Sequence, residues 1–326
     1  MAKKSESSVK SLEAPENVVK VNHEFLFIYD AKLCNPNGDP GNENKPRMDE
    51  DRDVNLCSDV RLKRFIRDYL QIYKKKKIYV TKIEGKPVEP KEVLKKLKEE
   101  KDELEFKDDS NIAEFYLKNL IDVRMFGATM AIEKEQMAFT GPIQINWGYS
   151  LHKVSLCNSY GITTTFKSSE QATQSSMGED WRVNYSLIAF YGNIIAHKAW
   201  NEVQKNGTLL TTDDIKLFDE AIVKSIPLFA TRSKIGQYPR FYLRLAYTNN
   251  EYIYGDLRSL VKFKIKPSVE ENVIKEENIR NVSEIILDVS RLQKLIDELK
   301  EKEMLDRDNS CFYKDLNLET IPEISF

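Results

Sequence analysis

Residues 24–47, EFLFIYDAKLCNPNGDPGNENKPR, decide the fold. They open with Phe25–Tyr29, a run of apolar, aromatic and β-branched residues that is too short for a typical helix and predicts a buried strand. The chain then enters Asn35–Asn42, a loop whose glycine, proline and asparagine residues favour turns. The groups that this segment can present to a ligand include Asn35, Asn37, Lys45 and Arg47. A grip for a phosphate backbone and a wide surface turn explain this composition equally well.

The helix expected after this loop is basic on one side. Ser58 is a good N-cap, and the helix is predicted to run to about Tyr73. Its apolar face has helical spacing and comprises Leu62, Phe65, Ile66, Tyr69 and Tyr73. Its other faces carry Lys63, Arg64 and Arg67. Asp59 can pair with Lys63 four residues later, whereas Arg67 has no acid at i−4. Unpaired bases beside the loop favour an anionic partner over a merely solvated face.

The composition is that of a globular protein. The chain has 326 residues, enough for one large domain or two ordinary ones, and 41% of them are hydrophobic and 31% charged. No apolar run approaches the roughly 20 residues that cross a bilayer. Residues 1–20 contain lysines but no apolar core of a secretory signal, so we expect a disordered leader there. A soluble, cytoplasmic protein is the expectation.

Cysteine and histidine give no sign of a metal or catalytic site. The four cysteines have no C-x-x-C spacing and are expected to be reduced thiols: Cys34, Cys57, Cys157 and Cys311. The three histidines have no partners at ligand spacing: His23, His152 and His197. We therefore expect no metal and no cofactor.

Charge is segregated along the chain although the net charge is only −2. Residues 61–77 carry eight Lys/Arg against one Asp, and residues 230–266 carry eight against two acids. Residues 270–326 carry fifteen acids against eight bases. Such a chain can bind a polyanion with one face, or dock its acidic end on a basic patch of another copy. Solvated lysine-rich surfaces are the plainer alternative, especially for Lys74–Lys77.

The middle of the chain alternates strands with less regular segments. Residues 74–110 are rich in lysine and glutamate and are interpreted as an insertion with a weakly packed helix. Residues 137–150 predict strand, turn and strand, with Trp147 on the same side as two isoleucines. A polar loop over residues 167–182 contains Met177 and Trp181, which either anchor it or insert between stacked bases.

The later elements complete an α+β pattern. After a buried strand at 183–196, residues 212–226 predict a helix, and Thr231–Gln237 form a second basic loop before the strand at 241–249. The order strand, helix, strands, helix, strand is typical of a ferredoxin-like or RNA-recognition-type sheet, here split by long insertions. The aromatic motifs with which RNA-recognition domains stack bases are absent.

Six stretches in this order resemble the backbone subunit of type I CRISPR surveillance complexes (Cascade), in the I-B subtype and close to I-C. They are NPNGDPGNENKPR, SDVRLKRFIRDY, DVRMFGA, FTGPIQINWGYSL, QSSMGEDWRVNYSLI and TRSKIGQYPRFYLRLAY. The resemblance samples most of residues 24–250 and is weakest in 74–110 and after 268.

The resemblance implies a non-catalytic protein with an RNA-recognition-like palm, an inserted finger region and a thumb. Its copies would stack along one CRISPR RNA, beside other Cascade subunits, and display the spacer for pairing with target DNA in antiviral defence. Implied boundaries are a single domain over 21–326, with fingers at 74–110, a thumb loop at 167–182 and a variable C-terminal helical extension at 268–326. The implied RNA-binding residues are Asn35, Asn37, Lys45, Arg47, Lys63, Arg64, Arg67, Gln174, Ser175, Met177, Arg182, Arg232, Lys234 and Gln237.

Two other functions fit parts of the sequence. Related subunits of type III complexes carry a catalytic acid in a palm loop, and Asp39 lies in such a loop here, so a metal-dependent endoribonuclease is one alternative. A turn aspartate needs no catalytic explanation, however. An RNA-binding protein outside CRISPR systems is the other alternative.

Overall fold

Strand β1 (His23–Cys34) lies at the centre of a nine-stranded sheet in the part of the chain that the structure describes. The structure is a computed structural model and describes residues 16–83, 86–87, 89–99, 112–132, 135–163, 177–204, 206–266, 275–315 and 323–326. β1 pairs antiparallel with β13 (Met177–Ile194) on one side and with β14 (Gln237–Tyr247) on the other. The strand predicted at Phe25–Tyr29 is therefore confirmed and extends in both directions.

The sheet has the strand order of a ferredoxin-like fold. The order runs β17-β14-β1-β13-β11-β5-β4, with β10 and β12 also paired to β13. Two helices, α1 (Asp59–Ile72) and α6 (Thr212–Leu228), connect the central strands in the sequence strand, helix, strands, helix, strand. The remaining strands of this sheet are β4 (Met48–Asp49), β5 (Val54–Cys57), β10 (Ile143–Ile145), β11 (Gly148–Ser150), β12 (Leu156–Thr163) and β17 (Leu305–Lys314). The predicted α+β class is confirmed.

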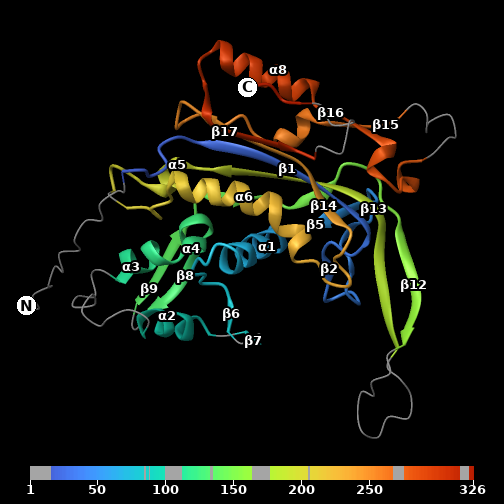
Figure 1. Ribbon diagram of the computed structural model, residues 1–326, viewed down its shortest axis with the longest axis horizontal. Helices are drawn as coiled ribbons and strands as arrows, with labels where there is room; N and C mark the ends of the chain where they lie inside the picture. Colours follow the sequence, from blue (N-terminus) through green and yellow to red (C-terminus); the bar gives the residue numbers. More distant parts are fainter. Residues whose placement is uncertain are drawn as a thin grey trace, which may run out of the picture.

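The two helices cover one face of the sheet (Figure 1). Ser58 caps α1, its hydroxyl accepting from the Arg61 N–H at 3.3 Å, and Tyr73 ends the helix, as the sequence predicts. Leu62, Phe65, Ile66 and Tyr69 are buried against Phe25, Phe27 and Tyr29 of β1 in one apolar core. Tyr73 departs from the prediction because it is 50% exposed at the end of the helix, where its ring stacks on Tyr69. In α6, Pro227 lies in the last turn instead of following the helix.

The C-terminal region covers the opposite face and forms a second core. Helix α8 (Ser290–Glu301) and the hairpin of β15 (Lys262–Ile265) and β16 (Ile285–Asp288) pack with Leu26 and Ile28 of β1. β17 then joins the edge of the sheet beside β14. Residues 268–326, expected to be a variable helical extension, contain helix α8 and also strands where they are described, and they supply an edge strand and a layer of the molecule (Figure 1).

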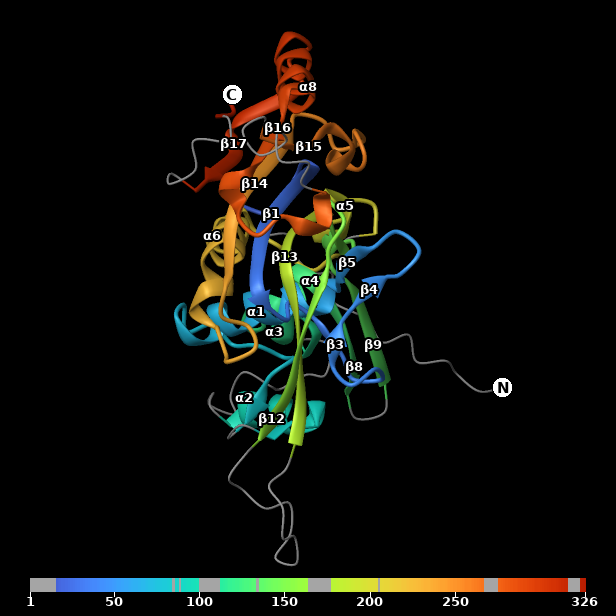
Figure 2. The same cartoon turned by 90° about the vertical axis from the view of Figure 1, so that its right-hand side faces the viewer.

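Two projections leave the sheet. β12 and the first part of β13 form a long two-stranded arm that points away from the body in both views (Figure 2). The arm includes residues 177–182, which the sequence placed in a loop; residues 164–176 lie outside the described residues. The other projection contains α2 (Pro90–Glu99), α3 (Ile112–Asn119), α4 (Ile121–Phe126), β6 (Lys82–Ile83), β7 (Lys86–Pro87), β8 (Gly127–Ile132) and β9 (Glu135–Thr140). Val93 and Leu97 of α2 are buried, so this helix is packed more firmly than expected.

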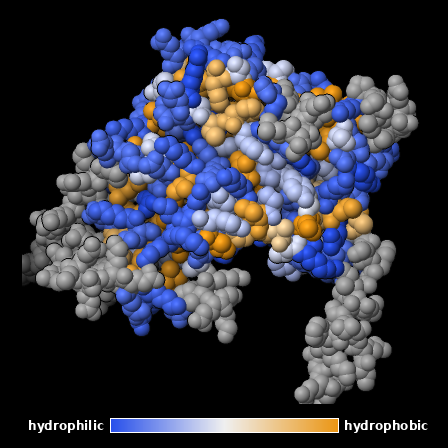
Figure 3. Space-filling view, in the orientation of Figure 1, coloured by the Kyte–Doolittle hydropathy of each residue, from blue (hydrophilic) through white to orange (hydrophobic). Residues whose placement is uncertain are grey.

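The short elements and the N-terminal segment complete the molecule. The remaining short elements are β2 (Gly38–Asp39), β3 (Lys45–Pro46), α5 (Ala196–Ala199), η3 (Leu257–Leu260), η4 (Glu276–Asn278) and η5 (Val282–Glu284). Val18 and Val19 are buried, and Val18 bridges to Thr211, so the expected leader is too long by these residues; residues 1–15 lie outside the description. Within the described residues, no helix is long and apolar enough to cross a membrane. On the face drawn in Figure 3, hydrophobic residues are scattered among hydrophilic ones.

Candidate nucleic-acid interface

Two loops meet at the end of the sheet where β1 stops and β14 starts. The loop after β1 and the loop Thr231–Gly236 are joined by a hydrogen bond from the Asn35 N–H to the Ser233 carbonyl at 2.8 Å. The Lys32 N–H also donates to the Gly236 carbonyl at 2.8 Å. Gly236 has φ +103°, and a Cβ there would lie 2.3 Å from the Lys32 carbonyl oxygen. Glycine thus allows the second loop to approach β1 closely.

Two cations face each other beneath these loops without a carboxylate between them. Arg61 comes from the first turns of α1 and stacks over the ring of Phe65 at 3.8 Å. Lys234 comes from the second loop and donates to the Asn35 carbonyl. Burial, and next the charge of Arg61, lower the pKa of Lys234 to about 8. In the described part of the chain neither cation forms an ion pair, and the Arg61 Nε is buried without a hydrogen-bond acceptor.

A third cation, Arg47, adds to the positive potential near this pair. Arg61, Lys234 and Arg47 all act electrostatically on the buried Cys57 thiol, although burial outweighs them and raises its pKa to about 11. The Asn35 Oδ1 is also buried without a donor. Two desolvated like charges repel each other, and an anion between them would remove that penalty. The arrangement is therefore suited to binding a phosphate group.

The loop after β1 places its predicted residues in different roles. The Asn35 amide donates to the Asn44 carbonyl at 2.7 Å and fixes the loop. The Asn37 Oδ1 accepts from both the N–H and the hydroxyl of Ser58, at 2.8 and 2.9 Å, which ties the loop to the start of α1. Lys45 and Arg47 lie at the surface of the same loop.

Each of these two surface cations has both an acid and an aromatic partner. Lys45 pairs with Glu43 at 3.0 Å and lies 4.6 Å from the Trp181 ring centroid. Arg47 pairs with Asp39 at 3.2 Å and lies 5.9 Å from the Trp147 ring centroid. All of these groups are partly exposed, so their ion pairs are weak and exchangeable.

A second group of cations shares one acid at the root of the arm. Arg182 donates to Asp180 at 2.7 and 3.0 Å, and Arg232 reaches the same carboxylate at 3.1 Å. Arg182 also donates to the Leu33 carbonyl at 2.8 Å, beside the end of β1. Two guanidinium groups on one carboxylate leave a net positive charge next to the two loops.

Three of the four cations of helix α1 are paired; the sequence allowed a partner for Lys63 only. Lys63 bonds Asp59 at 2.9 Å, and Arg64 pairs with Asp68, four residues later. Arg67 is buried and pairs with Asp122 at 2.9 Å.

The prediction that Arg67 lies free on a basic face is therefore wrong. Its acid comes from 55 residues away, so local spacing held no sign of it. Because Arg67 is buried and paired with Asp122, its main role in the described residues is structural.

The remaining predicted residues lie partly outside the description. Gln174 and Ser175 fall outside the described residues, and Met177 is described only by its backbone pairing with Thr163. Gln237 is buried and donates to the Lys234 carbonyl at 2.9 Å, so it supports the second loop.

Arg61 is the functional candidate that the sequence interpretation missed. The signal was present: its neighbours at i−4 and i+4 are Cys57 and Phe65, and Arg64 follows at i+3, so it has no local acid. The sequence did not reveal that Lys234, which is distant in the chain, lies close to Arg61 in the fold.

Among the residues that the structure describes, the central strands of the sheet are covered on both faces. One face is covered by α1 and α6 and the other by the C-terminal layer. RNA-recognition domains stack bases on an open sheet face. The missing aromatic motifs are therefore consistent with the architecture, because here the face that would carry them is a core.

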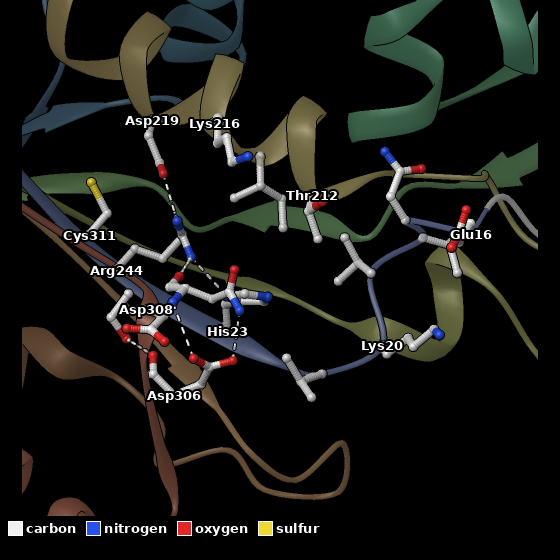
Figure 4. A pocket seen from close by; sticks show the side chains of 17 residues that line it. Glu16, Lys20, His23, Thr212, Lys216, Asp219, Arg244, Asp306, Asp308 and Cys311 are labelled. Carbon is white, nitrogen blue, oxygen red and sulfur yellow. Dashed lines mark hydrogen bonds and ion pairs between the residues drawn. The ribbon is translucent and has the colours of Figure 1, made fainter.

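A cavity of about 500 Å³ lies at the other end of β1 around His23 (Figure 4). Its buried Arg244 donates to both oxygens of Asp219, at 2.6 and 2.8 Å, and so is already neutralised. Burial, and next the charge of Arg244, lower the pKa of His23 to about 3, so this imidazole is neutral. Among the described residues, no cluster of three or more His, Cys, Asp or Glu side chains is arranged to hold a metal ion.

Three comparisons with known proteins all find similarity to CRISPR-associated proteins. The family model described as "CRISPR-associated protein Cas7" matches residues 21–290. A curated CRISPR-associated protein Cas7 from Haloferax volcanii is 31% identical over 304 residues, which cover 86% of this chain and 84% of that protein. A solved chain of a "CRISPR RNA-guided surveillance complex, pre-nicking" superposes with a TM-score of 0.52 at 11% identity, covering 92% of this chain and 94% of that one. At this identity the superposition establishes the fold.

Proposed function

This chain belongs to the CRISPR-associated Cas7 family, and on that premise we propose that it binds CRISPR RNA as the backbone subunit of a type I surveillance complex, of subtype I-B. Several copies would lie along one guide RNA in the cytoplasm and hold its spacer for pairing with target DNA, beside other Cascade subunits, in antiviral defence. The protein supplies backbone binding, and base pairing supplies the sequence specificity. The proposal assigns no catalytic step, no metal and no cofactor to the chain.

The observation that carries the proposal is the pair of partly buried cations, Arg61 and Lys234, for which the described residues supply no ion-pair partner. Unpaired buried charges are costly and are retained where a ligand compensates them. A phosphate group of RNA supplies the missing negative charge without any demand on base identity. The near-neutral net charge of −2 is compatible with this proposal, because Lys and Arg are enriched in residues 61–77 and 230–266, which contain Arg61 and Lys234.

Further contacts would surround this central pair. We assign phosphate and sugar contacts to the exposed cations of the two loops and the arm root: Lys45, Arg47, Arg182 and Arg232. Asn35, Asn37 and Gln237 would position the loops. Lys63 and Arg64 would lie at the margin, while Arg67 would hold the fold. Residues 74–110 would supply the fingers and residues 167–182 the thumb, including Gln174, Ser175 and Met177.

Asp39 has a structural role that supports the non-catalytic assignment. Its carboxylate pairs with Arg47, accepts from the Gly41 N–H at 3.2 Å, and its carbonyl accepts from the N–H groups of Asn42 and Asn44. These contacts form the turn between β2 and β3 and account for an aspartate at this position.

The test is RNA binding by variants of the cation pair. Arg61→Met and Lys234→Met, alone and together, should weaken binding of unrelated single-stranded RNA sequences by the same factor. The slope of log affinity against log salt should become shallower by about 0.7 for each phosphate that the variant no longer neutralises. Lys216→Met is the matched control, because Lys216 is exposed on α6 and pairs with Asp213 far from the loops.

Two outcomes decide against the proposal. Unchanged affinity and salt slope in the double variant would remove the cation pair from the RNA site. An equal loss of affinity in Lys216→Met would mean that the effect is one of net charge alone. Sequencing of RNA that co-purifies with the wild-type protein separates the CRISPR role, which requires a uniform short species, from general RNA binding.

A further inference from the structure

Trp147 is presented to solvent although a strand lies shortly before it and another directly after it. The alternation of residues 143–149 predicts Trp147 on the buried side with Ile143 and Ile145. In the structure β10 ends at Ile145 and β11 starts at Gly148, and both pair with β13, so Asn146 and Trp147 bulge out between them. Trp147 is 44% exposed, whereas Trp200 is buried and Trp181 is half-buried.

The bulge is held rigidly from behind. Arg258, whose side chain is only 3% exposed, binds both oxygens of Asp256 and donates to the Trp147 carbonyl at 2.7 Å. The guanidinium also lies 4.3 Å from the Tyr149 ring centroid. The Trp147 N–H is bound by the Asn146 side chain at 2.8 Å. An exposed indole on so fixed a backbone costs little entropy when a ligand stacks on it.

A cavity of about 160 Å³ lies against this indole, between it and the loop after β1. A dry cavity of about 150 Å³ is known to take one benzene ring, so the space suits one flat ring system. Its apolar lining comes from Met48, Leu56, Leu156 and Trp147, and its polar lining includes Asp39 and Arg47.

The contact between Arg47 and the Trp147 indole is weak, so a ligand can displace the cation. Arg47 lies 5.9 Å from the ring centroid, near the outer limit of about 6 Å for a cation–π contact. Lys45 lies closer to the other indole, at 4.6 Å, and the Trp181 Nε1 donates to Glu179 at 2.7 Å. The face of Trp147 is thus the more accessible of the two.

The loop after β1 lines the cavity and also contacts the start of α1, the helix that carries Arg61. The Arg47 N–H donates to the Asn37 carbonyl at 3.1 Å, and the Asn37 side chain caps α1 at Ser58, three residues before Arg61. The loop that lines the cavity is therefore fixed to the start of the helix that carries Arg61.

We propose that the Trp147 cavity binds one nucleobase of the bound RNA, stacked on the indole. The inference rests on the proposed RNA-binding function and adds to it a contact to a base where the cation pair contacts only phosphate. Stacking accepts any base, because every base has a π-face, so the cavity is compatible with a guide of arbitrary sequence. Arg258 is a positioning residue in this scheme, since it touches the Trp147 backbone and not the ligand.

The test compares an oligonucleotide with its abasic counterpart. Wild-type protein, stripped of nucleic acid by salt, is titrated with oligouridylate and with a ribose-phosphate oligomer of the same length that lacks bases. The wild type should prefer the base-bearing oligomer, and in Trp147→Ala that preference should fall about tenfold while the affinity for the abasic oligomer stays unchanged. Trp147→Phe keeps a ring and should restore most of the preference. Thermal melts of each variant verify the fold.

The outcomes separate this inference from the function on which it rests. If wild type binds neither oligomer, the RNA-binding function itself is wrong. If it binds both equally, or if Trp147→Ala keeps the base preference, RNA binding stands and the base cavity is refuted. If Trp147→Ala instead abolishes self-association in the absence of RNA, measured by sedimentation, the indole belongs to a contact between copies and the inference is wrong.

Discussion

RNA affinity should fall as pH rises from 7 to 9, because Lys234 loses its proton in this range. Its pKa of about 8 lies well below the usual 10.5, first through burial and then through Arg61. The fraction of protonated Lys234 drops from about 0.9 at pH 7 to about 0.1 at pH 9. If phosphate binding requires the ammonium, affinity falls about tenfold. The other groups that face Lys234 do not interfere: burial raises the pKa of Cys57 to about 11 and that of Cys34 to about 12.

The assay is fluorescence anisotropy with oligoadenylate, whose bases do not titrate between pH 7 and 9. Lys234→Arg keeps a charge throughout and should show almost no dependence on pH. An equal decline in Lys234→Arg would refute the reasoning, since the titrating group would then lie elsewhere.

Stability of the RNA-free protein should move in the opposite direction. The folded state binds fewer protons at Lys234 than the unfolded chain does between pH 8 and 10.5, so the free energy of unfolding rises with pH across that window. A shift of this size corresponds to about 3 kcal/mol. Urea unfolding at pH 7.5 and 9.5 should detect about 2 kcal/mol of this rise, and Lys234→Met should remove it.

Three further predictions concern single residues. Arg67→Met should cost about 3 kcal/mol of stability because it leaves Asp122 buried without its cation, whereas Lys63→Met should cost less than about 1 kcal/mol; equal shifts in a thermal melt would contradict the burial argument. Neither wild type nor Asp39→Asn should cut a complementary RNA in the presence of Mg²⁺, and a product made only by wild type would place the protein among the nucleases. Gly236→Ala, at φ +103°, should displace the loop that carries Lys234 and reduce RNA affinity by a larger factor than it reduces the folding equilibrium; the reverse ranking would show that this loop serves only the fold.

Local signals in the sequence were sufficient for the helix α1. The cap at Ser58 and the end at Tyr73 are each determined by residues within about one turn of that position. The structure has both ends of the helix as predicted. The same holds for the central strand and for the α+β class, because alternating and helical periods are properties of short windows.

Partners from distant parts of the chain were not predictable in this way. Arg67 seemed unpaired because Asp122 reaches it only through the fold. Arg61 and Lys234 form the candidate site only because the loops after β1 and before β14 meet. Trp147 was assigned to the wrong side because a two-residue bulge interrupts the alternation. In each case the deciding contact joins segments that are distant in the sequence, and local propensity does not encode such contacts.

The position of β1 in the sheet has a consequence during synthesis. β1 ends at Cys34, while its two partner strands begin at Met177 and Gln237, and the layer that covers its second face comes later still. A ribosome that adds about 5–20 residues per second leaves this strand without a neighbour for roughly ten to thirty seconds. Its five consecutive apolar residues are exposed to other nascent chains for that time, with open hydrogen-bonding edges. We therefore expect the newborn chain to depend on holding chaperones until β13 emerges, and the yield of folded protein to rise when translation past residue 34 is fast.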